Sequence, residues 1–168
     1  MRKILMAANW KMNHTTEQTN HYFDVFTTLA SKAEWYPKKT FELVFASSFT
    51  SLMTATQCSK ELAFQTAAQN VHAAAKGAYT GEISIPMLKE LAVQWVILGH
   101  SERRQFFAET DEAVAKKALA CMQAGLKIIV CVGESKEQRQ AGKSEEIVSA
   151  QLKVLLEQGF DSEKLLIA

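Results

Sequence analysis

Six apolar runs of strand length recur along the chain, and they limit the folds that it can adopt. They cover residues 4–8, 43–46, 62–67, 95–98, 128–132 and 165–168. Each run is continuous rather than alternating, which is typical of strands that are buried on both faces of a parallel sheet. We therefore expect six parallel strands.

Segments with helical periodicity lie between some of these runs. The first begins with the capping-box pattern Thr15-x-x-Gln18 and continues as an apolar stripe on one helix face. Two later stripes, within residues 114–122 and 147–156, predict further helices, each followed by a glycine. Alternating strands and helices leave two architectures open, a doubly wound sheet or a closed (β/α)8 barrel. Periodicity does not choose between them.

Composition describes a folded chain of ordinary character. Hydrophobic residues make up 48% of the 168 residues and charged residues 22%, unlike a disordered protein. Length alone corresponds to about one domain. The sequence has no repeat, low-complexity segment or linker, so we interpret residues 1–168 as a single domain.

The net charge of +1 and the scattered charges favour neither nucleic acid nor a charged surface as a partner. Short basic pairs, Arg103–Arg104 and Lys38–Lys39, are interpreted as solvated surface. Histidines 14, 21 and 72 match no motif and are interpreted in the same way. No apolar run reaches the roughly 18 residues of a membrane span, and the first is too short for a signal peptide.

Cys58, Cys121 and Cys131 are odd in number and widely spaced, without a Cys-x-x-Cys pair. We interpret them as reduced thiols and expect a cytoplasmic protein. The sequence also has no zinc motif, dinucleotide fingerprint or P-loop, so we expect neither a metal nor a cofactor.

The first predicted strand ends in Asn9, Trp10 and Lys11. In parallel α/β folds, functional side chains gather beyond the carboxyl ends of strands. A lysine there can meet an anion or a developing oxyanion. The alternative is a lysine that faces solvent at the start of a loop.

The fourth predicted strand runs through Gly99 into His100, Ser101 and Glu102. We expect Ser101 to cap a short helix that begins at Glu102. A helix N-terminus disfavours positive charge on a nearby imidazole, so His100 is expected to be neutral and able to donate to a carbonyl oxygen. The alternative is a surface loop whose glutamate and arginines pair with each other.

Five blocks of sequence together resemble triosephosphate isomerase. They are residues 9–13, 68–70, 77–82, 95–104 and 131–134, in matching order and spacing over the whole chain. The resemblance implies the (β/α)8 TIM barrel fold. It also implies an isomerase of glycolysis and gluconeogenesis, which interconverts dihydroxyacetone phosphate and D-glyceraldehyde 3-phosphate through an enediolate.

The resemblance assigns roles to residues at two strand ends. Asn9 and Lys11 would contact a small phosphorylated triose, with Ser101 beside them. His100 would be the electrophile at the substrate carbonyl, and Glu102 would support the site. His100, Lys11 and Glu102 are therefore the expected catalytic residues.

The connection from Gln69 to Glu82 has no clear helical or strand pattern, and a connection of this length is usually functional. In the family this loop reaches into a neighbouring subunit. The resemblance therefore implies a homodimer whose interface includes Asn13, Gln69, Thr80, Gly81 and Glu82. The alternative is a loop that lies on its own barrel.

Three departures from the family accompany the resemblance. Tyr79 stands where phenylalanine is common. Ala108 stands where glycine is frequent, and we expect it to constrain a backbone angle that glycine tolerates more easily. A (β/α)8 barrel takes about 250 residues. Residues 1–168 are therefore expected to hold five βα units and the start of strand six, a truncated barrel with open apolar edges at its first and last strands.

The family's glutamate base, mobile lid and most of its phosphate site follow strand six. We therefore expect the 168-residue chain to be inactive by itself, and to become active with a C-terminal complementing segment. The alternative is a non-catalytic barrel fragment that acts only in binding, folding or self-assembly.

Overall fold

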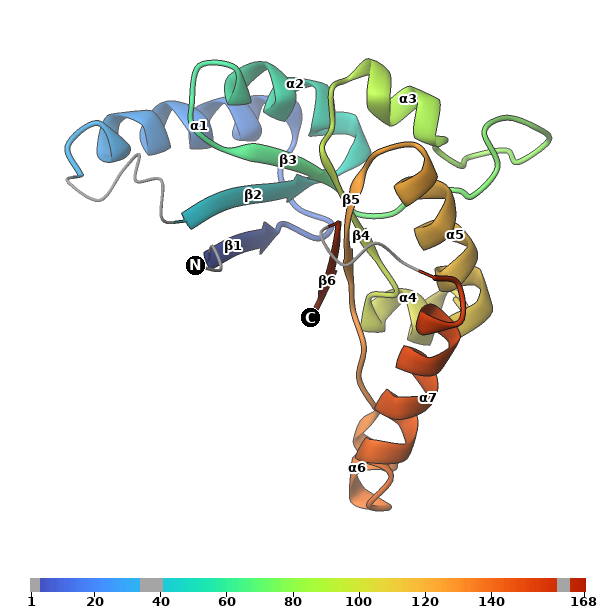
Figure 1. The fold of residues 1–168 in the computed structure, drawn as a ribbon. Helices are drawn as coiled ribbons and strands as arrows, with labels where there is room; N and C mark the ends of the chain where they lie inside the picture. Colours follow the sequence, from blue (N-terminus) through green and yellow to red (C-terminus); the bar gives the residue numbers. More distant parts are fainter. Residues whose placement is uncertain (1–3, 34–40, 160–163) are drawn as a thin grey trace. The chain divides into compact units, whose positions relative to one another are not determined.

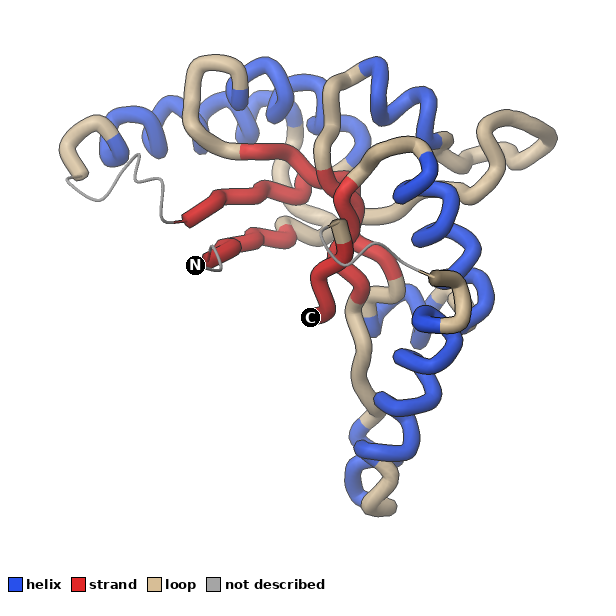
Figure 2. The backbone as a smooth tube through the Cα atoms, in the orientation of Figure 1, coloured by secondary structure: helices blue, strands red, loops and turns tan. Residues whose placement is uncertain are grey.

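Strands and helices alternate along the chain in the computed structural model, which describes residues 4–33, 41–159 and 164–168. The strands are β1 (Ile4–Asn9), β2 (Phe41–Ser47), β3 (Gln65–Ala68), β4 (Trp95–Leu98), β5 (Lys127–Val130) and β6 (Leu165–Ile167). The helices are α1 (Thr16–Ala30), α2 (Phe49–Ser59), α3 (Ile85–Glu90), α4 (Ser101–Phe106), α5 (Asp111–Gln123), α6 (Lys136–Gln140) and α7 (Ser144–Leu156). Figures 1 and 2 show this alternation, with the strands as arrows and then in red.

The strand order is β1-β2-β3-β4-β5-β6, the same as the order along the chain. β1 pairs in parallel with β2, β2 with β3, and β5 with β6. Parallel strands in chain order with helical connections are the arrangement of an incomplete (β/α)8 barrel. The structure therefore confirms the predicted fold class.

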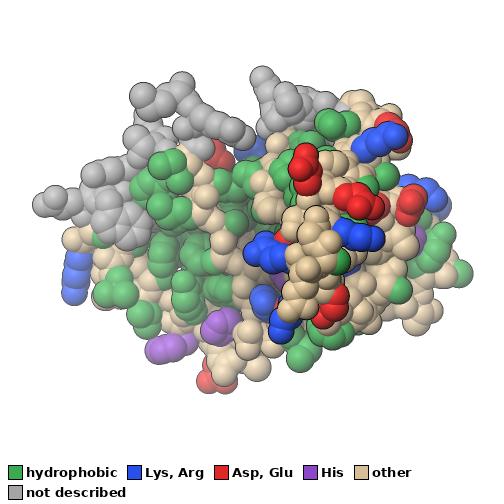
Figure 3. All heavy atoms as spheres, turned by 90° about the horizontal axis from the view of Figure 1, so that it is seen from below, with side chains coloured by type: hydrophobic (Ala, Val, Ile, Leu, Met, Phe, Trp, Pro, Cys, Tyr) green, Lys and Arg blue, Asp and Glu red, His purple; other side chains and the backbone are tan. Residues whose placement is uncertain are grey.

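The inner strands are buried, whereas the first and last strands are not. All four residues of β4 are buried, as are five of the seven in β2. In β1, Ile4 is 62% exposed and Met6 51%, and in β6 Ile167 is 41% exposed. Continuous burial thus holds for the inner strands only, and the expectation of apolar edges at β1 and β6 is confirmed. The face shown in Figure 3 carries exposed hydrophobic side chains, drawn in green.

Contacts divide the chain into two units. The first comprises Met1–Gln69 and Pro86–Trp95, and the second comprises Asn70–Ile85 and Val96–Ala168. That residues 1–168 form a single domain therefore stays a prediction. The predicted basic pair Lys38–Lys39 lies outside the described residues.

An aromatic cluster forms the core of the first unit. Phe23 of α1 stacks on Phe64 at 4.6 Å between ring centroids, and Phe45 of β2 meets Phe64 at 5.0 Å. Trp10 joins them at the end of β1. The predicted capping box of α1 is present, since Gln18 N donates to the Thr15 hydroxyl and Thr15 N donates to the Gln18 side chain. The cluster therefore anchors the segment that follows β1.

In the second unit, α5 and α7 pack against each other, as Figure 1 also shows. Val114, Ala118 and Cys121 are buried on one face of α5, as the apolar stripe predicts. Gly125 ends the last turn with φ +85°, a left-handed conformation that suits glycine. The predicted helices are therefore confirmed.

The third strand begins later than predicted. Phe64 N donates to Leu62 O over 2.8 Å, so the chain turns at residues where we expected strand. Leu62 and Phe64 pack in the aromatic cluster instead. These two residues are apolar because they pack in the core, not because they pair in a strand.

Candidate active site

Lys11 follows β1 in a left-handed conformation, with φ +54°. Two side chains hold this backbone. Lys11 N donates to Asn9 Oδ1 over 3.0 Å, and Gln69 Nε2 donates to Lys11 O over 2.8 Å. Gln69 also donates to Ala46 O at the end of β2. A residue other than glycine keeps such a conformation only where its surroundings hold it, and such residues gather at functional sites.

The segment after Lys11 is tied to the core of its unit. The Trp10 side chain is buried, and the Asn13 side chain donates to Trp10 O over 2.8 Å. His14 packs edge-on against Trp10 at 4.6 Å, and its carbonyl accepts from Ser51. His14 is partly exposed, as a surface residue would be, and one side of its ring rests on Trp10.

His100 is the N-cap of α4, and Ser101 is the exposed first residue of that helix. The expectation that Ser101 caps the helix is therefore wrong. Gly99, with φ +68°, turns the chain one residue earlier than we expected, so the His100 side chain reaches the free helix N–H groups.

The hydrogen bond of His100 decides which ring nitrogen carries a proton. Glu102 N–H donates to His100 Nδ1 over 3.3 Å. Because a backbone amide only donates, Nδ1 accepts, and the proton of the neutral ring lies on Nε2. The carboxylate of Glu102 lies 3.5 Å from Nδ1, a contact that is an ion pair only when the ring is protonated. Nε2–H is thus the donor that His100 offers to a ligand.

The two arginines after Glu102 are not the solvated pair that we expected. Arg104 is only 18% exposed, and it bonds to Gly99 O and Cys131 O and pairs with Asp111. Arg103 is 27% exposed and lies over the Phe107 ring at 5.0 Å. Both belong to the packed surroundings of His100 in their unit.

A buried ion pair joins α5 to the segment that precedes it. Lys117 of α5 bonds to Glu109, whose side chain is only 3% exposed, and to Asn70 Oδ1 over 3.0 Å. Sequence reasoning missed this group, since Lys117 sits in a helix without a motif. The buried charge pair links the start of the 69–82 connection to α5.

The block at residues 131–134 ends in a nearly buried carboxylate. Glu134 accepts from Arg139 Nε over 2.7 Å and from Ser144 Oγ over 2.9 Å. The Arg139 hydrogen bond, together with a backbone N–H and Ser144, lowers the pKa of Glu134 below its ordinary value. Glu134 therefore acts as an anchor for α6 and α7 in the described structure.

A backbone hydrogen bond joins the two ends of the 69–82 connection, whereas its tip is exposed. His72 N donates to Ile83 O over 2.8 Å, and the His72 ring lies 4.0 Å from that of Tyr79. His72 Nδ1 also accepts from Ala74 N. His72 is partly exposed, and its contacts also help to organise the loop. Thr80, Gly81 and Glu82 are exposed at the tip.

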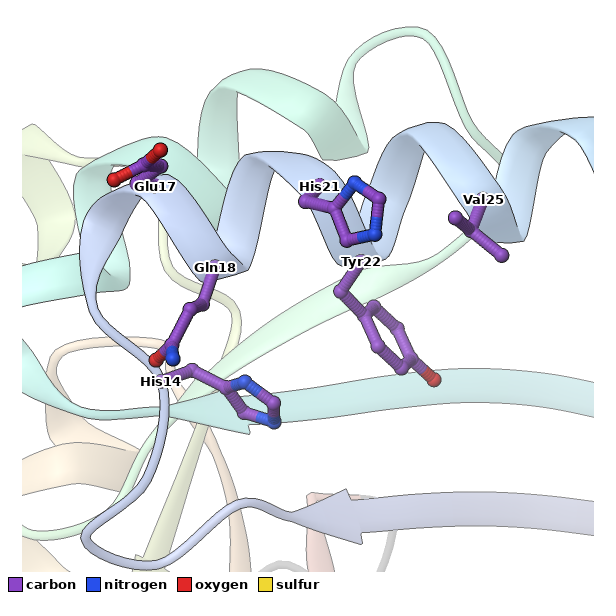
Figure 4. A pocket seen from close by; sticks show the side chains of 6 residues that line it. All are labelled: His14, Glu17, Gln18, His21, Tyr22 and Val25. Carbon is purple, nitrogen blue, oxygen red and sulfur yellow. The ribbon is translucent and has the colours of Figure 1, made fainter.

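An open cavity of about 630 Å³ lies beside α1 in the first unit. Its lining residues, labelled in Figure 4, are His14, Glu17, Gln18, His21, Tyr22 and Val25. None of them is a predicted site residue. Within the part of the chain that the structure describes, no three side chains form a cluster able to hold a metal ion, and no helix could cross a membrane. The three cysteines are free thiols, as expected.

The structure brings the predicted catalytic and substrate-binding residues together in two groups. Asn9 and Lys11 are bonded to each other at the end of β1 in the first unit. His100, Ser101 and Glu102 lie at the end of β4 in the second unit. Each group occupies the carboxyl end of its strand, where parallel α/β folds carry their functional groups.

Comparisons with known proteins agree with this geometry. The family model described as triosephosphate isomerase matches residues 4–168. Triosephosphate isomerase of Aquifex aeolicus is 43% identical over 93% of this chain and 61% of its own length. That of Acetivibrio thermocellus is 44% identical over 92% of this chain and 59% of its own length. That of Gloeothece citriformis is 44% identical over 100% of this chain and 68% of its own length. The chain thus spans about three fifths of the first two relatives.

Proposed function

Because the chain belongs to the triosephosphate isomerase family, we propose that it supplies part of the active site of a triosephosphate isomerase. The reaction is the interconversion of dihydroxyacetone phosphate and D-glyceraldehyde 3-phosphate, a step of glycolysis and gluconeogenesis. The main support from the site is His100, whose Nε2–H is left to donate because Nδ1 accepts from Glu102 N.

The residues of both strand ends suit this chemistry. Removing a proton beside a carbonyl builds negative charge on the oxygen, and groups that are already in place stabilise that charge best. His100 Nε2–H would donate to the oxygen, and the Lys11 ammonium would stabilise its charge. Asn9 and Gln69 hold the Lys11 backbone, so that little reorganisation would be needed during the reaction. Ser101 would lie beside the substrate.

The proton itself requires a base. In the family a glutamate base works with a neutral histidine, and that glutamate follows strand six. The carboxylate of Glu102 lies 3.5 Å from His100 Nδ1, and we assign it a supporting role. We therefore expect a polypeptide of residues 1–168 to be inactive alone, and to gain activity from a segment that completes the barrel.

We further propose a cytoplasmic homodimer. The exposed tip at Thr80, Gly81 and Glu82 would reach the partner's loop near Lys11, where Met12 is 95% exposed. Asn13 and Gln69 would shape the receiving surface through the bonds that hold that loop. The free cysteines are compatible with a reducing compartment.

The test is a fusion of residues 1–168 to the segment that follows the matched region in the Gloeothece citriformis relative. Turnover of glyceraldehyde 3-phosphate is followed by coupling the product to NADH oxidation. We expect the fusion to turn over and residues 1–168 alone not to. His100→Ala should lower kcat by at least about a hundred-fold, the usual contribution of a positioned proton donor.

His21→Ala is the matched control, since His21 is an exposed histidine outside both strand ends. A folded fusion without turnover would contradict the isomerase and favour the non-catalytic alternative. Turnover by residues 1–168 alone would contradict the need for a base beyond β6. Full activity of the His100→Ala fusion would contradict the role of His100.

A further inference from the structure

Arg104 joins three elements of the second unit through one guanidinium group. Its Nε donates to Gly99 O over 2.7 Å, and its Nη2 donates to Cys131 O over 3.3 Å. Its Nη1 pairs with the carboxylate of Asp111, the first residue of α5. Gly99 follows β4 and Cys131 follows β5, so Arg104 ties the carboxyl ends of both strands to a helix start.

Gly99 allows the guanidinium to come this close. A Cβ atom at Gly99 would lie 2.9 Å from Arg104 Nη2, closer than real Cβ atoms approach, and 3.0 Å from Cys131 O, tighter than nearly all real contacts. The φ of +68° also favours glycine at this position. Arg104 therefore packs directly against the backbone that precedes His100.

The carbonyl that Arg104 holds belongs to the peptide unit that leads into His100. Because a peptide unit is planar, the direction of Gly99 C=O sets the direction of His100 N and Cα. The hydrogen bond from Glu102 N to Nδ1 then sets the ring. Arg104 thus fixes the backbone end of His100, and Glu102 N–H fixes the imidazole end.

We propose that Arg104 is a positioning residue that aims the Nε2 proton of His100. The inference deepens the isomerase proposed above and rests on it for its catalytic consequence. Asp111 in turn orients Arg104, and the two side chains are only 31% and 18% exposed, respectively. Lysine cannot replace this function, because its single ammonium lacks the planar set of donors that reaches three acceptors at once.

The kinetic test compares Arg104→Lys with the parent fusion protein. We expect kcat to fall by about a hundred-fold, the effect of a misplacement of about 1 Å. KM for glyceraldehyde 3-phosphate should stay within about two-fold, because ground-state binding is retained. Arg139→Lys is the matched control: Arg139 also bonds a carboxylate through Nε, but its side chain is 78% exposed and its partner is Glu134. It should keep the parental kcat.

A second measurement reports on His100 without requiring turnover. In protein labelled with ¹⁵N-histidine, the nitrogen shifts should place the proton of His100 on Nε2, and a His100→Gln variant assigns the signals. Arg104→Lys should mix the two tautomers or broaden the His100 signals, whereas Arg139→Lys should not. If Arg104→Lys does not fold, Asp111→Asn tests the same arrangement, with an expected loss of about ten-fold in kcat.

Unchanged His100 signals in a folded Arg104→Lys or Asp111→Asn protein would overturn the positioning role, and so would an unchanged kcat in an active fusion. If Arg104 only stabilised the fold, its substitution would lower the melting temperature and leave the His100 signals and kcat unchanged. If the parent fusion shows no turnover, the isomerase proposal fails, while the nitrogen shifts still decide whether Arg104 positions His100.

Discussion

Four of the described residues other than glycine have a left-handed backbone, and one of them, Lys11, belongs to the proposed site. Lys11 and His14 have φ values of +54° and +68°, and Ala108 has φ +50° just after α4. An L-residue in this region costs of order 1–2 kcal/mol, so each must be held by its surroundings. Lys11 is held by Asn9 and Gln69. Specific side-chain hydrogen bonds thus maintain the strained backbone at Lys11.

Ala108 offers a direct test of such strain. Ala108→Gly should stabilise the protein by about 0.5–1 kcal/mol, because relief of the left-handed conformation exceeds the entropy that glycine loses on folding. The free energy of unfolding in urea measures the change. Ala141→Gly is the control, since Ala141 has φ −81° and should lose about 0.5–1 kcal/mol. Destabilisation by Ala108→Gly would contradict the strain at this residue.

Single residues also show what the sequence could and could not predict. The strained angle at Ala108 was foreseen, because glycine is frequent there in the family. The cap of α4 was not, because histidine is an unusual N-cap and only the turn at Gly99 brings its ring to the helix. The contacts of Arg104 were missed for a related reason. Two of them are made to backbone carbonyls, which leave no trace in a side-chain pattern.

At the level of elements, α5 combines an apolar face with one buried charge. Lys117 reaches Glu109 and Asn70 from this helix, and both Lys117 and Glu109 are largely hidden from solvent. Removing Lys117 would leave the buried Glu109 carboxylate with Arg103, whose Nε lies 3.5 Å away, and breaking such a buried pair is strongly destabilising. Losing one partner would therefore destabilise the fold by more than the attraction within the pair stabilises it.

Lys117→Met should accordingly lower the free energy of unfolding by about 3–5 kcal/mol. Lys116→Met is the matched control, because Lys116 is the preceding residue of α5 and is exposed, so its change should stay within about 0.5 kcal/mol. Chemical denaturation of both variants gives the two values. Equal effects of the two substitutions would rule out a special role for the buried pair.

Helices with a clear apolar stripe were predicted, whereas α2, with eleven residues, was not, and the short α4 was expected from the strand end that precedes it. α1, α5 and α7 followed from their apolar stripes and caps. α3 and α6 span six and five residues, too few for a helical period to be recognised. The start of β3 was misplaced because Leu62 and Phe64 are apolar for packing rather than pairing. Tertiary contacts, which are absent from the local sequence, decide such boundaries.

At the scale of the whole molecule, β1 and β6, the first and last strands of the sheet, are more exposed than the strands between them. β1 exposes Ile4 and Met6, and β6 exposes Ile167. Strands with exposed apolar side chains and a free edge are templates for pairing with other chains. A polypeptide of residues 1–168 is therefore expected to self-associate through β1 and β6.

Met6→Lys tests this expectation, because a lysine on an edge strand opposes edge-to-edge pairing. We expect it to reduce self-association of the 168-residue polypeptide, measured by sedimentation velocity across a concentration series. Met53→Lys on α2 is the control, with a methionine 55% exposed against 51% for Met6. If both lysines act equally, added charge rather than the strand edge is responsible.

The agreement between strand order and chain order has a consequence for how the protein is made. Every resolved pairing, β1 with β2, β2 with β3 and β5 with β6, joins strands that are consecutive in the chain. A ribosome releases such a chain from its N-terminus at about 5–20 residues per second. Each new strand can therefore dock on the strand synthesised just before it, without waiting for a distant part of the chain. Folding during synthesis can advance one βα unit at a time, with the Lys11 loop in place before His100 emerges.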